Sequence, residues 1–206
     1  MRHFLAAVPL LLVGACSDTA PRTAADSQAA HVAEVAAAGG TVDSIFPIAE
    51  QLRRFRDGLP SVDTLRNAAT SRDALIRQFL RAVSASDTLT LNQLVLDRSE
   101  FAYLYYPHAA ISQPPYEAPP QLLWGQILMS TNDGLPRVLA RAAGQSLDLS
   151  RVTCADSIAT EGPNRLHEKC ALTLRIGKGS AIETRWFGTI VERDGRFKFL
   201  GYANPL

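Results

Sequence analysis

Glu168 is the side chain of greatest chemical interest in this sequence. In RLHEKCALTLRI the alternate positions Leu166, Cys170 and Leu172 are apolar, and Glu168 falls among them on one face of a predicted strand. A carboxylate on an apolar face would be desolvated, which is the condition for general acid–base work. The alternative places Glu168 near the start of the strand, at an open rim that water reaches, and this placement is favoured.

Three tyrosines offer a second kind of chemistry. Tyr103, Tyr105 and Tyr106 lie in EFAYLYYP, whose alternation predicts a strand. Their hydroxyls could donate hydrogen bonds to a developing oxyanion. Aromatic side chains on strands more often fill a core or line a cavity, so Glu168, Tyr103 and Tyr105 stand only as catalytic candidates.

Motifs for phosphate, nucleophile or metal chemistry are missing from the sequence. The glycine-containing segment 177–180 lacks the spacing of a phosphate-binding loop, and no Gly-x-Ser-x-Gly elbow occurs. A structural zinc site needs four ligands, and no histidine is spaced from a cysteine as in a zinc finger. Lys and Arg number 21 against 20 Asp and Glu, so no charge excess points to nucleic acid. We expect no metal and no cofactor.

Residues 1–15 have the order of a secretory signal peptide. A basic start is followed by an apolar run from Phe4 to Val13, which is too short to span a bilayer, and then by Gly14 and Ala15. The next residue is Cys16, and VGAC resembles the bacterial lipobox, in which that cysteine becomes the lipid-modified first residue. An ordinary secreted protein with a chance cysteine is the alternative.

The lipobox resemblance implies a location. The protein would be held by acyl chains in the bacterial cell envelope, with the membrane as one partner. Ser17, rather than aspartate, follows Cys16, which by the same resemblance favours the outer membrane facing the periplasm. Residues 16–42 are rich in Ala, Thr, Ser, Asp and Gly and predict a flexible tether, with a transient helix in QAAHVAEVAAA.

Two cysteines remain for the folded part. Cys154 and Cys170 would lie in an oxidising compartment, and their number is even, so a disulfide between them is predicted. If residues 161–163 close a hairpin, the two cysteines face each other within disulfide reach. Cys170 is then predicted to share one row across the sheet with Gly188 and Gly201.

The remaining periodicities predict helices followed by strands. Residues 43–70 form a helical extension, and a capping-box pattern at 70–73 opens a helix with a buried face. A short helix after Asp87, the strand at 101–106 and a proline-rich irregular segment follow. Residues 121–131 are helical, and residues 135–143 continue or restart that helix after Asp133-Gly134. Four antiparallel strands occupy the rest from Leu147. The fold class is therefore α+β.

Turn chemistry fixes two strand registers. The two-residue turn Asp194-Gly195 places Arg193 opposite Arg196, and Ile190 then faces Phe199.

The second register depends on burial. A three-residue loop at 178–180 places Leu172 opposite Trp186, which brings the apolar faces together, whereas a two-residue loop would not. Under this register Glu168 joins the row of Ile190 and Phe199.

From about residue 71 the chain resembles a known superfamily. ALIRQFLRAVSASDT, WFGTIVERDGRFKFLGYANPL and the order of elements between them are similar to the nuclear transport factor 2-like superfamily, which includes ketosteroid isomerases and polyketide cyclases. The resemblance implies that residues 71–206 form a cone, in which helices pack into a strongly curved antiparallel sheet. Its pocket-lining candidates are the apolar residues Phe101, Trp186, Ile190 and Phe199.

The expected function is non-catalytic binding of an envelope protein or a small apolar ligand. The runner-up is a small-molecule isomerase, cyclase or hydrolase that uses Glu168 and a tyrosine as acid and base. A scaffold that dimerises through the outer sheet face, as the resemblance implies, is a third possibility. An enzyme needs at least two titratable groups aimed at one point of a closed cavity, which is the feature that separates the first two.

Overall fold

The computed structural model describes residues 24–39 and 46–202 in two units, residues 1–45 and 46–206. In the first unit, α1 (Ala24–Ala37) covers most of the predicted QAAHVAEVAAA helix. The signal peptide, Cys16 and the first part of the tether lie outside the described residues. In the described ranges no helix is both long and apolar enough to cross a membrane.

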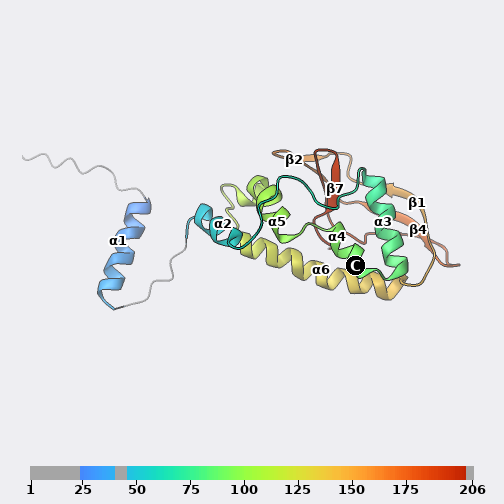
Figure 1. Cartoon of the computed structure of the whole chain (residues 1–206), viewed down its shortest axis with the longest axis horizontal. Coiled ribbons are helices and arrows are strands. Elements are labelled where there is room, and N and C mark those ends of the chain that lie inside the picture. Colours follow the sequence, from blue (N-terminus) through green and yellow to red (C-terminus); the bar gives the residue numbers. More distant parts are fainter. Residues whose placement is uncertain (1–23, 40–45, 203–206) are drawn as a thin grey trace, which may run out of the picture. The chain divides into compact units, whose positions relative to one another are not determined.

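The main helices of the second unit have the capping and periodicity expected from the sequence. They are α2 (Ile48–Arg56), α3 (Arg72–Ala85), α4 (Thr88–Leu94) and α6 (Pro120–Ala142). The side chain of Ser71 accepts a hydrogen bond from the Ala74 amide and starts α3, so the cap is Ser71 and not Thr70. Of the two possibilities left open at Asp133-Gly134, the structure shows continuation, because α6 runs through these residues and through Pro136 (Figure 1).

The predicted strand at 101–106 is also wrong. The segment is helical: α5 (Arg98–Glu100) leads into the π-helix η1 (Phe101–Tyr105) and the 3₁₀ turns η2 (Tyr106–His108) and η3 (Ala110–Ser112). The cause is a capping box, in which the side chains of Asp97 and Glu100 each accept the other's backbone amide. The short helix is buried on nearly all sides, and its aromatic alternation therefore does not mark a strand.

The C-terminal part of the chain forms two antiparallel sheets, which confirms the α+β class. One sheet has the order β1-β4-β5 and the other β2-β3-β6-β7. The strands are β1 (Leu147–Thr153), β2 (Ala159–Glu161), β3 (Asn164–His167), β4 (Ala171–Ile176), β5 (Ala181–Thr184), β6 (Ile190–Arg193) and β7 (Arg196–Phe199). Each of the first three predicted long strands is divided between the two sheets.

The register of the last hairpin is confirmed. Arg193 lies opposite Arg196 and Ile190 opposite Phe199. The backbone amide of Gly188 donates to the carbonyl of Gly201 at 3.0 Å, so the two glycines are neighbours as predicted.

The other two predicted pairings are wrong. Leu172 lies opposite Thr184, two residues from Trp186, because the turn lies one residue earlier than predicted and the Gly179 amide donates to the Ile176 carbonyl at 3.0 Å. The even shift keeps the same face inward. His167, rather than Glu168, lies opposite Ile190. Lys169 has a left-handed backbone (φ 53°), which interrupts the strand between β3 and β4 and changes the register there.

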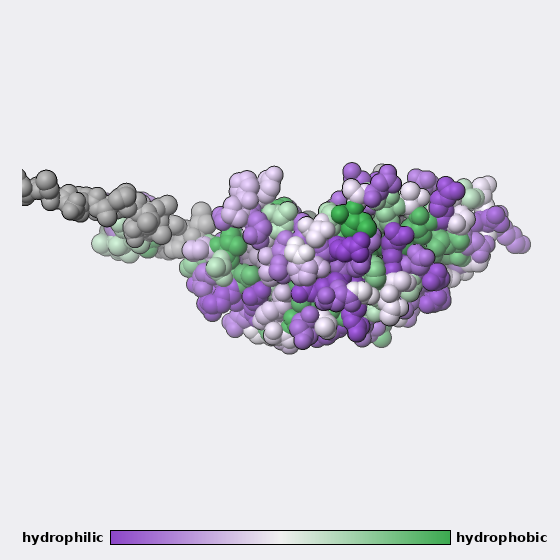
Figure 2. All heavy atoms as spheres, turned by 90° about the horizontal axis from the view of Figure 1, so that it is seen from above, coloured by the Kyte–Doolittle hydropathy of each residue, from purple (hydrophilic) through white to green (hydrophobic). Residues whose placement is uncertain are grey.

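Two hydrophobic clusters hold the second unit together. In the first, the ring of Phe79 on α3 packs against Phe187, Phe199 and Tyr202, with ring centroids 5.4–5.6 Å apart. The second surrounds Phe101 and joins α2, η1 and α6 to β3 and β6. The face shown in Figure 2 is largely hydrophilic, with smaller hydrophobic patches between the hydrophilic residues.

Candidate functional site

The structure brings Tyr105 and Glu168 into one neighbourhood. Glu161 and Leu166 share a face of the β2–β3 hairpin, because Glu161 pairs with Asn164 and the alternate residues of β3 point the same way, and Glu168 directly follows the end of β3. This face meets η1, since the side-chain amide of Asn164 donates to the Leu104 carbonyl at 2.9 Å. The hydroxyl of Tyr105 on η1 is near enough to the carboxylates of Glu161 and Glu168 for their negative charges to act on it.

Tyr105 would act there as a hydrogen-bond donor rather than as a base. Its side chain is 8% exposed, and burial raises the pKa of its hydroxyl, with the negative charges of Glu161 and Glu168 raising it further. Glu161 is already engaged, because its Oε1 accepts the Ala110 amide at 2.9 Å. Glu168 is half-buried, and this degree of burial is intermediate between the enclosed and the rim placements considered from the sequence.

The other candidate residues identified from the sequence are packed against neighbouring side chains. Tyr103 is half-buried beneath the guanidinium of Arg56, which lies 4.5 Å from the ring centroid. The four pocket-lining candidates are packed into the two hydrophobic clusters and are at most 3% exposed: Phe101, Trp186, Ile190 and Phe199. They do not line the surface cavities described next.

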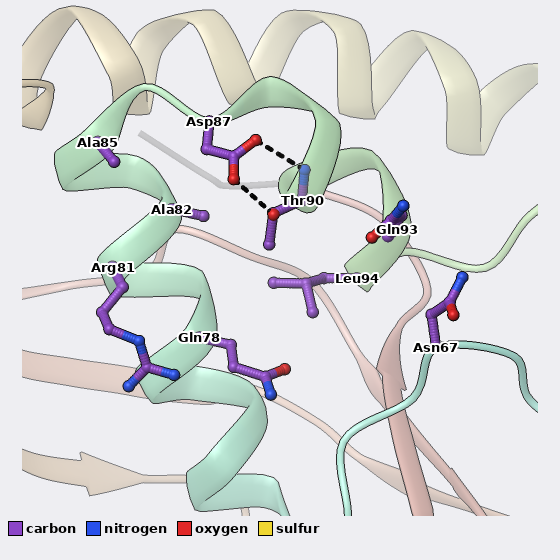
Figure 3. A pocket seen from close by; sticks show the side chains of 9 residues that line it. All are labelled: Asn67, Gln78, Arg81, Ala82, Ala85, Asp87, Thr90, Gln93 and Leu94. Carbon is purple, nitrogen blue, oxygen red and sulfur yellow. Dashed lines mark hydrogen bonds between the residues drawn. The ribbon is translucent and has the colours of Figure 1, made fainter.

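A polar cavity of about 420 Å³ lies between α3 and α4. Figure 3 shows the α3 side chains on one side and the α4 side chains on the other, with Asn67 from the preceding loop. Asp87 is held in place as the cap of α4, since its two oxygens accept the backbone amide of Thr90 at 3.0 Å and the hydroxyl of Thr90 at 2.6 Å. These hydrogen bonds lower the pKa of Asp87. The lining residues are Asn67, Gln78, Arg81, Ala82, Ala85, Asp87, Thr90, Gln93 and Leu94.

A second cavity, of about 590 Å³, lies between α3 and β1. Arg77, Arg81 and Ser84 line it from α3, and Asp148 lines it from β1. The hydroxyl of Ser84 donates to the Gln145 carbonyl at 2.6 Å, which fixes the end of α3 to the start of this sheet. Arg81 lines both this cavity and the one between α3 and α4.

The arginines of α3 differ from those of α2. Arg53 and Arg54 are paired with Glu50 at 2.7 Å, and Arg56 donates to the Ala102 carbonyl, so α2 presents little free positive charge although Arg53 and Arg56 line a cavity of about 390 Å³. Arg77 and Arg81 are exposed, and their guanidinium groups form no ion pair or hydrogen bond with other residues in 24–39 or 46–202.

These two arginines are candidate functional residues that were not singled out from the sequence. Their i, i+4 spacing places them one above the other on α3, and that signal was available from the sequence. The cavities beside them depend on where α4 and β1 pack. We name the surface formed by Arg77, Arg81 and the two cavities the α3 groove.

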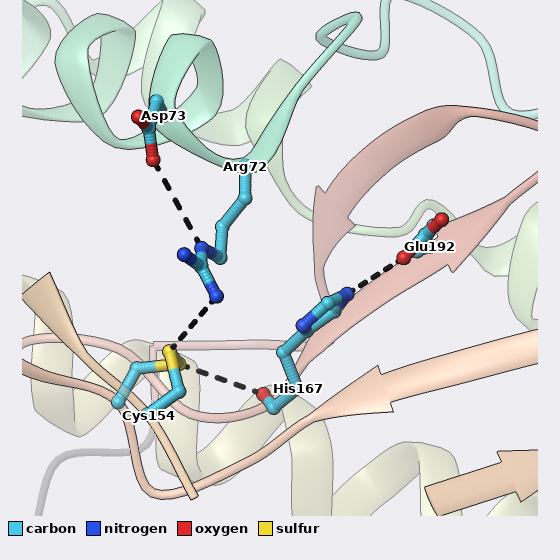
Figure 4. Close-up of a disulfide and its surroundings, with 6 residues drawn as sticks. Arg72, Asp73, Cys154, His167 and Glu192 are labelled. Carbon is cyan, nitrogen blue, oxygen red and sulfur yellow. Dashed lines mark hydrogen bonds and ion pairs between the residues drawn. A yellow bond between two sulfur atoms is a disulfide. The ribbon is translucent and has the colours of Figure 1, made fainter. Parts of the chain in front are cut away.

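Figure 4 shows the disulfide between Cys154 and Cys170 and the side chains around it. The sulfur atoms of Cys154 and Cys170 lie 2.09 Å apart, as expected for the predicted disulfide, and a guanidinium nitrogen of Arg72 lies 3.9 Å from the Cys154 sulfur. Nearby, Nε2 of the buried His167 lies 2.7 Å from Oε2 of Glu192. Within the described part of the chain no group of three or more His, Cys, Asp or Glu side chains is arranged to hold a metal ion.

Comparison with known proteins found no match: no protein-family model, curated protein or solved structure is similar to this chain.

Proposed function

We propose that the second unit is a non-catalytic binding domain that holds an acidic segment of a partner protein in the α3 groove. The observation that carries the proposal is Arg81, an exposed guanidinium with no partner in the described residues that lines two adjoining cavities. Arginine binds carboxylates through paired, charge-assisted hydrogen bonds. An acidic segment would meet Arg81 without first breaking an internal ion pair.

The chemistry of the groove favours a polar partner over the small apolar ligand expected from the sequence. Gln78 and Gln93 supply amide groups beside Arg81, while the hydroxyl of Thr90 is engaged by Asp87. The volumes of both cavities lie in the range of ligand-binding sites. The rings that would have lined an apolar pocket, such as Phe199 and Trp186, are packed against Phe79 instead.

The proposal includes a membrane anchor at Cys16. VGAC and the preceding apolar run support lipid attachment, and residues 16–42 would then hold the binding domain away from the membrane. The partner would be an envelope protein on the same side of that membrane. The nuclear transport factor 2-like resemblance and the cone shape remain predictions.

The test is binding of a defined acidic probe. A fluorescent glutamate homopeptide should bind the wild-type protein, whereas a lysine homopeptide should not. Arg81→Ala should weaken binding of the acidic peptide by about tenfold or more, since a hydrogen bond to a charged group contributes roughly 1.5–3 kcal/mol. Arg196→Ala, which removes an exposed arginine from β7 in the other sheet, is the matched control and should leave affinity unchanged. Equal losses in the two variants would contradict the proposal.

A second candidate function rests on the neighbourhood of Tyr105 and Glu168. The half-buried Glu168 carboxylate could transfer a proton between carbons beside a carbonyl group, while the protonated Tyr105 hydroxyl donates a hydrogen bond to the developing oxyanion. A β,γ-unsaturated ketone is the probe, and formation of the conjugated enone is the readout. Turnover that is lost in both Tyr105→Phe and Glu168→Gln would support this function, and no turnover by the wild-type protein would exclude this isomerisation.

A further inference from the structure

The free edge of β1 adjoins the α3 groove. Among residues 24–39 and 46–202, the sheet order β1-β4-β5 leaves β1 paired on one side only, and the cavity between α3 and β1 is lined by Leu147, Asp148 and Leu149. A strand edge presents unpaired backbone N–H and C=O groups that can pair with another chain. Here those groups border the recess that contains Arg77 and Arg81.

The hydrogen-bond pattern identifies which backbone groups are free. The Gly177 amide donates to the Ser146 carbonyl at 2.8 Å, so this pair is of the hydrogen-bonded type. Residue pairs alternate along an antiparallel ladder, which directs the backbone of Asp148 toward β4 and that of Leu147 and Leu149 away from it. The two residues with outward-facing backbone groups are thus cavity-lining residues.

We infer that the partner's acidic segment binds as an added strand along β1, with alternate acidic side chains reaching Arg77 and Arg81; this rests on the proposed function. Two residues four apart on a helix are separated by about 6 Å along its axis. Alternate residues of a strand are separated by about 7 Å and point to the same face. An extended segment with acidic residues at every second position therefore matches the spacing of the two arginines.

The site on β1 has a defined end. The β1–β4 pairing shifts between Leu149 and Arg151, and the hydroxyl of Ser150 donates to the Thr173 carbonyl at 2.9 Å. A bulge of this kind bends the edge and interrupts regular pairing. The added strand therefore pairs with Leu147–Leu149, beside α3. The opposite edge, β5, does not line any of the three cavities described above.

N-methylated peptides test strand addition without altering the protein. The probe is a short peptide in which Glu alternates with Val, and two versions carry N-methyl groups on alternate amides in the two possible phases. The phase that blocks the amides facing β1 should weaken binding about 25-fold, since two amides would donate to the carbonyls of Leu147 and Leu149 and each net hydrogen bond is worth roughly a fivefold change in affinity. The other phase should bind like the unmodified peptide. Equal effects of both phases, or of neither, would overturn strand addition.

A pair of protein variants provides an independent test of strand addition along β1. Leu147→Pro removes an outward-facing amide at the beginning of an edge strand, where proline is tolerated, and Leu147→Ala removes the same side chain but keeps the amide. Leu147→Pro should bind the Glu–Val peptide more weakly than Leu147→Ala, and equal binding would overturn the inference. Loss of binding in Arg81→Ala alone would leave the proposed function intact without strand addition. Unchanged binding in Arg81→Ala would overturn both.

Discussion

The ammonium group of Lys198 lies 2.7 Å from Oε2 of Glu100, and the two side chains are 3% and 0% exposed. The same carboxylate accepts the backbone amides of Arg66 at 2.6 Å and Asp97 at 2.9 Å. One buried charge thus joins the loop before α3, the start of α5 and strand β7. All of its contacts are internal, so this ion pair organises the fold and is not a binding site.

Removal of one partner of this pair should be strongly destabilising. Lys198→Met leaves the Glu100 carboxylate buried without its counter-charge, and we expect a loss of about 3–5 kcal/mol in the free energy of unfolding, measured with urea. The double variant Glu100→Gln/Lys198→Met should be less destabilised than the sum of the single changes. Arg53→Ala breaks an exposed pair with Glu50 and is the control, expected to cause no measurable change. Equal stability of Lys198→Met and Arg53→Ala would contradict the structure.

The disulfide should stabilise the second unit, because it closes a loop of the chain between the two cysteines. Cys154 and Cys170 are 16 residues apart, and closing a loop of this length contributes roughly 3 kcal/mol by restricting the unfolded chain. Cys154→Ser/Cys170→Ser should lose about that amount. Peptide mass spectrometry without reduction should find the two cysteines in one linked peptide, and two free thiols would refute the pairing.

Turn residues, helix caps and apolar periodicity predicted the elements that depend on neighbouring residues in the sequence. The register around Arg193 and Arg196 follows from the intervening Asp-Gly turn, and α3 follows from its apolar period and cap. The prediction of a strand from Phe101 to Tyr105 was wrong because alternating aromatic residues are compatible with a buried helix as well as with a strand. The Asp-x-x-Glu pattern from Asp97 was the signal that distinguishes the two.

Long-range relationships could not be predicted in the same way. Lys198 lies between two phenylalanines on β7, and its partner Glu100 is 98 residues away, so no local pattern joins them. Glu168 was placed beside Ile190 because a regular strand was assumed through Lys169, whose left-handed backbone shifts the register. The spacing of the α3 arginines was visible in the sequence, but the neighbouring cavities exist only once α4 and β1 are packed.

Two buried tyrosines should make the protein sensitive to alkali. Burial raises the pKa of the hydroxyls of Tyr105 and Tyr202 above their ordinary value, and the Tyr202 hydroxyl also donates to the Leu91 carbonyl at 2.7 Å. Above about pH 10 the unfolded chain loses these protons while the folded chain retains them, so stability falls as pH rises through that region and is independent of them below it. Urea unfolding at neutral pH and near pH 11 should show a smaller decrease for Tyr105→Phe than for the wild type. An unchanged decrease would exclude Tyr105 as a contributor.

The anchor prediction concerns Cys16, outside the described residues. In cells that process lipoproteins, the mature protein should begin at Cys16, carry acyl chains and fractionate with membranes. Cys16→Ser should abolish acylation and release the protein from the membrane fraction, while binding of the acidic probe should be retained. A mature N-terminus at another residue, without lipid, would refute the anchor.

The last prediction compares two glutamates that differ in burial. Glu168 is half-buried, and its side chain has no hydrogen bond or ion pair to another described residue, whereas Glu100 is fully buried and holds Lys198. Glu168→Gln should change the free energy of unfolding by no more than about 0.5 kcal/mol, as for most surface substitutions. Glu100→Gln should cost several kcal/mol, because a neutral amide leaves the Lys198 ammonium buried without a counter-charge. Urea unfolding of both variants at neutral pH provides the comparison. A large effect at Glu168 would contradict its half-buried placement and would show that its carboxylate has a buried partner.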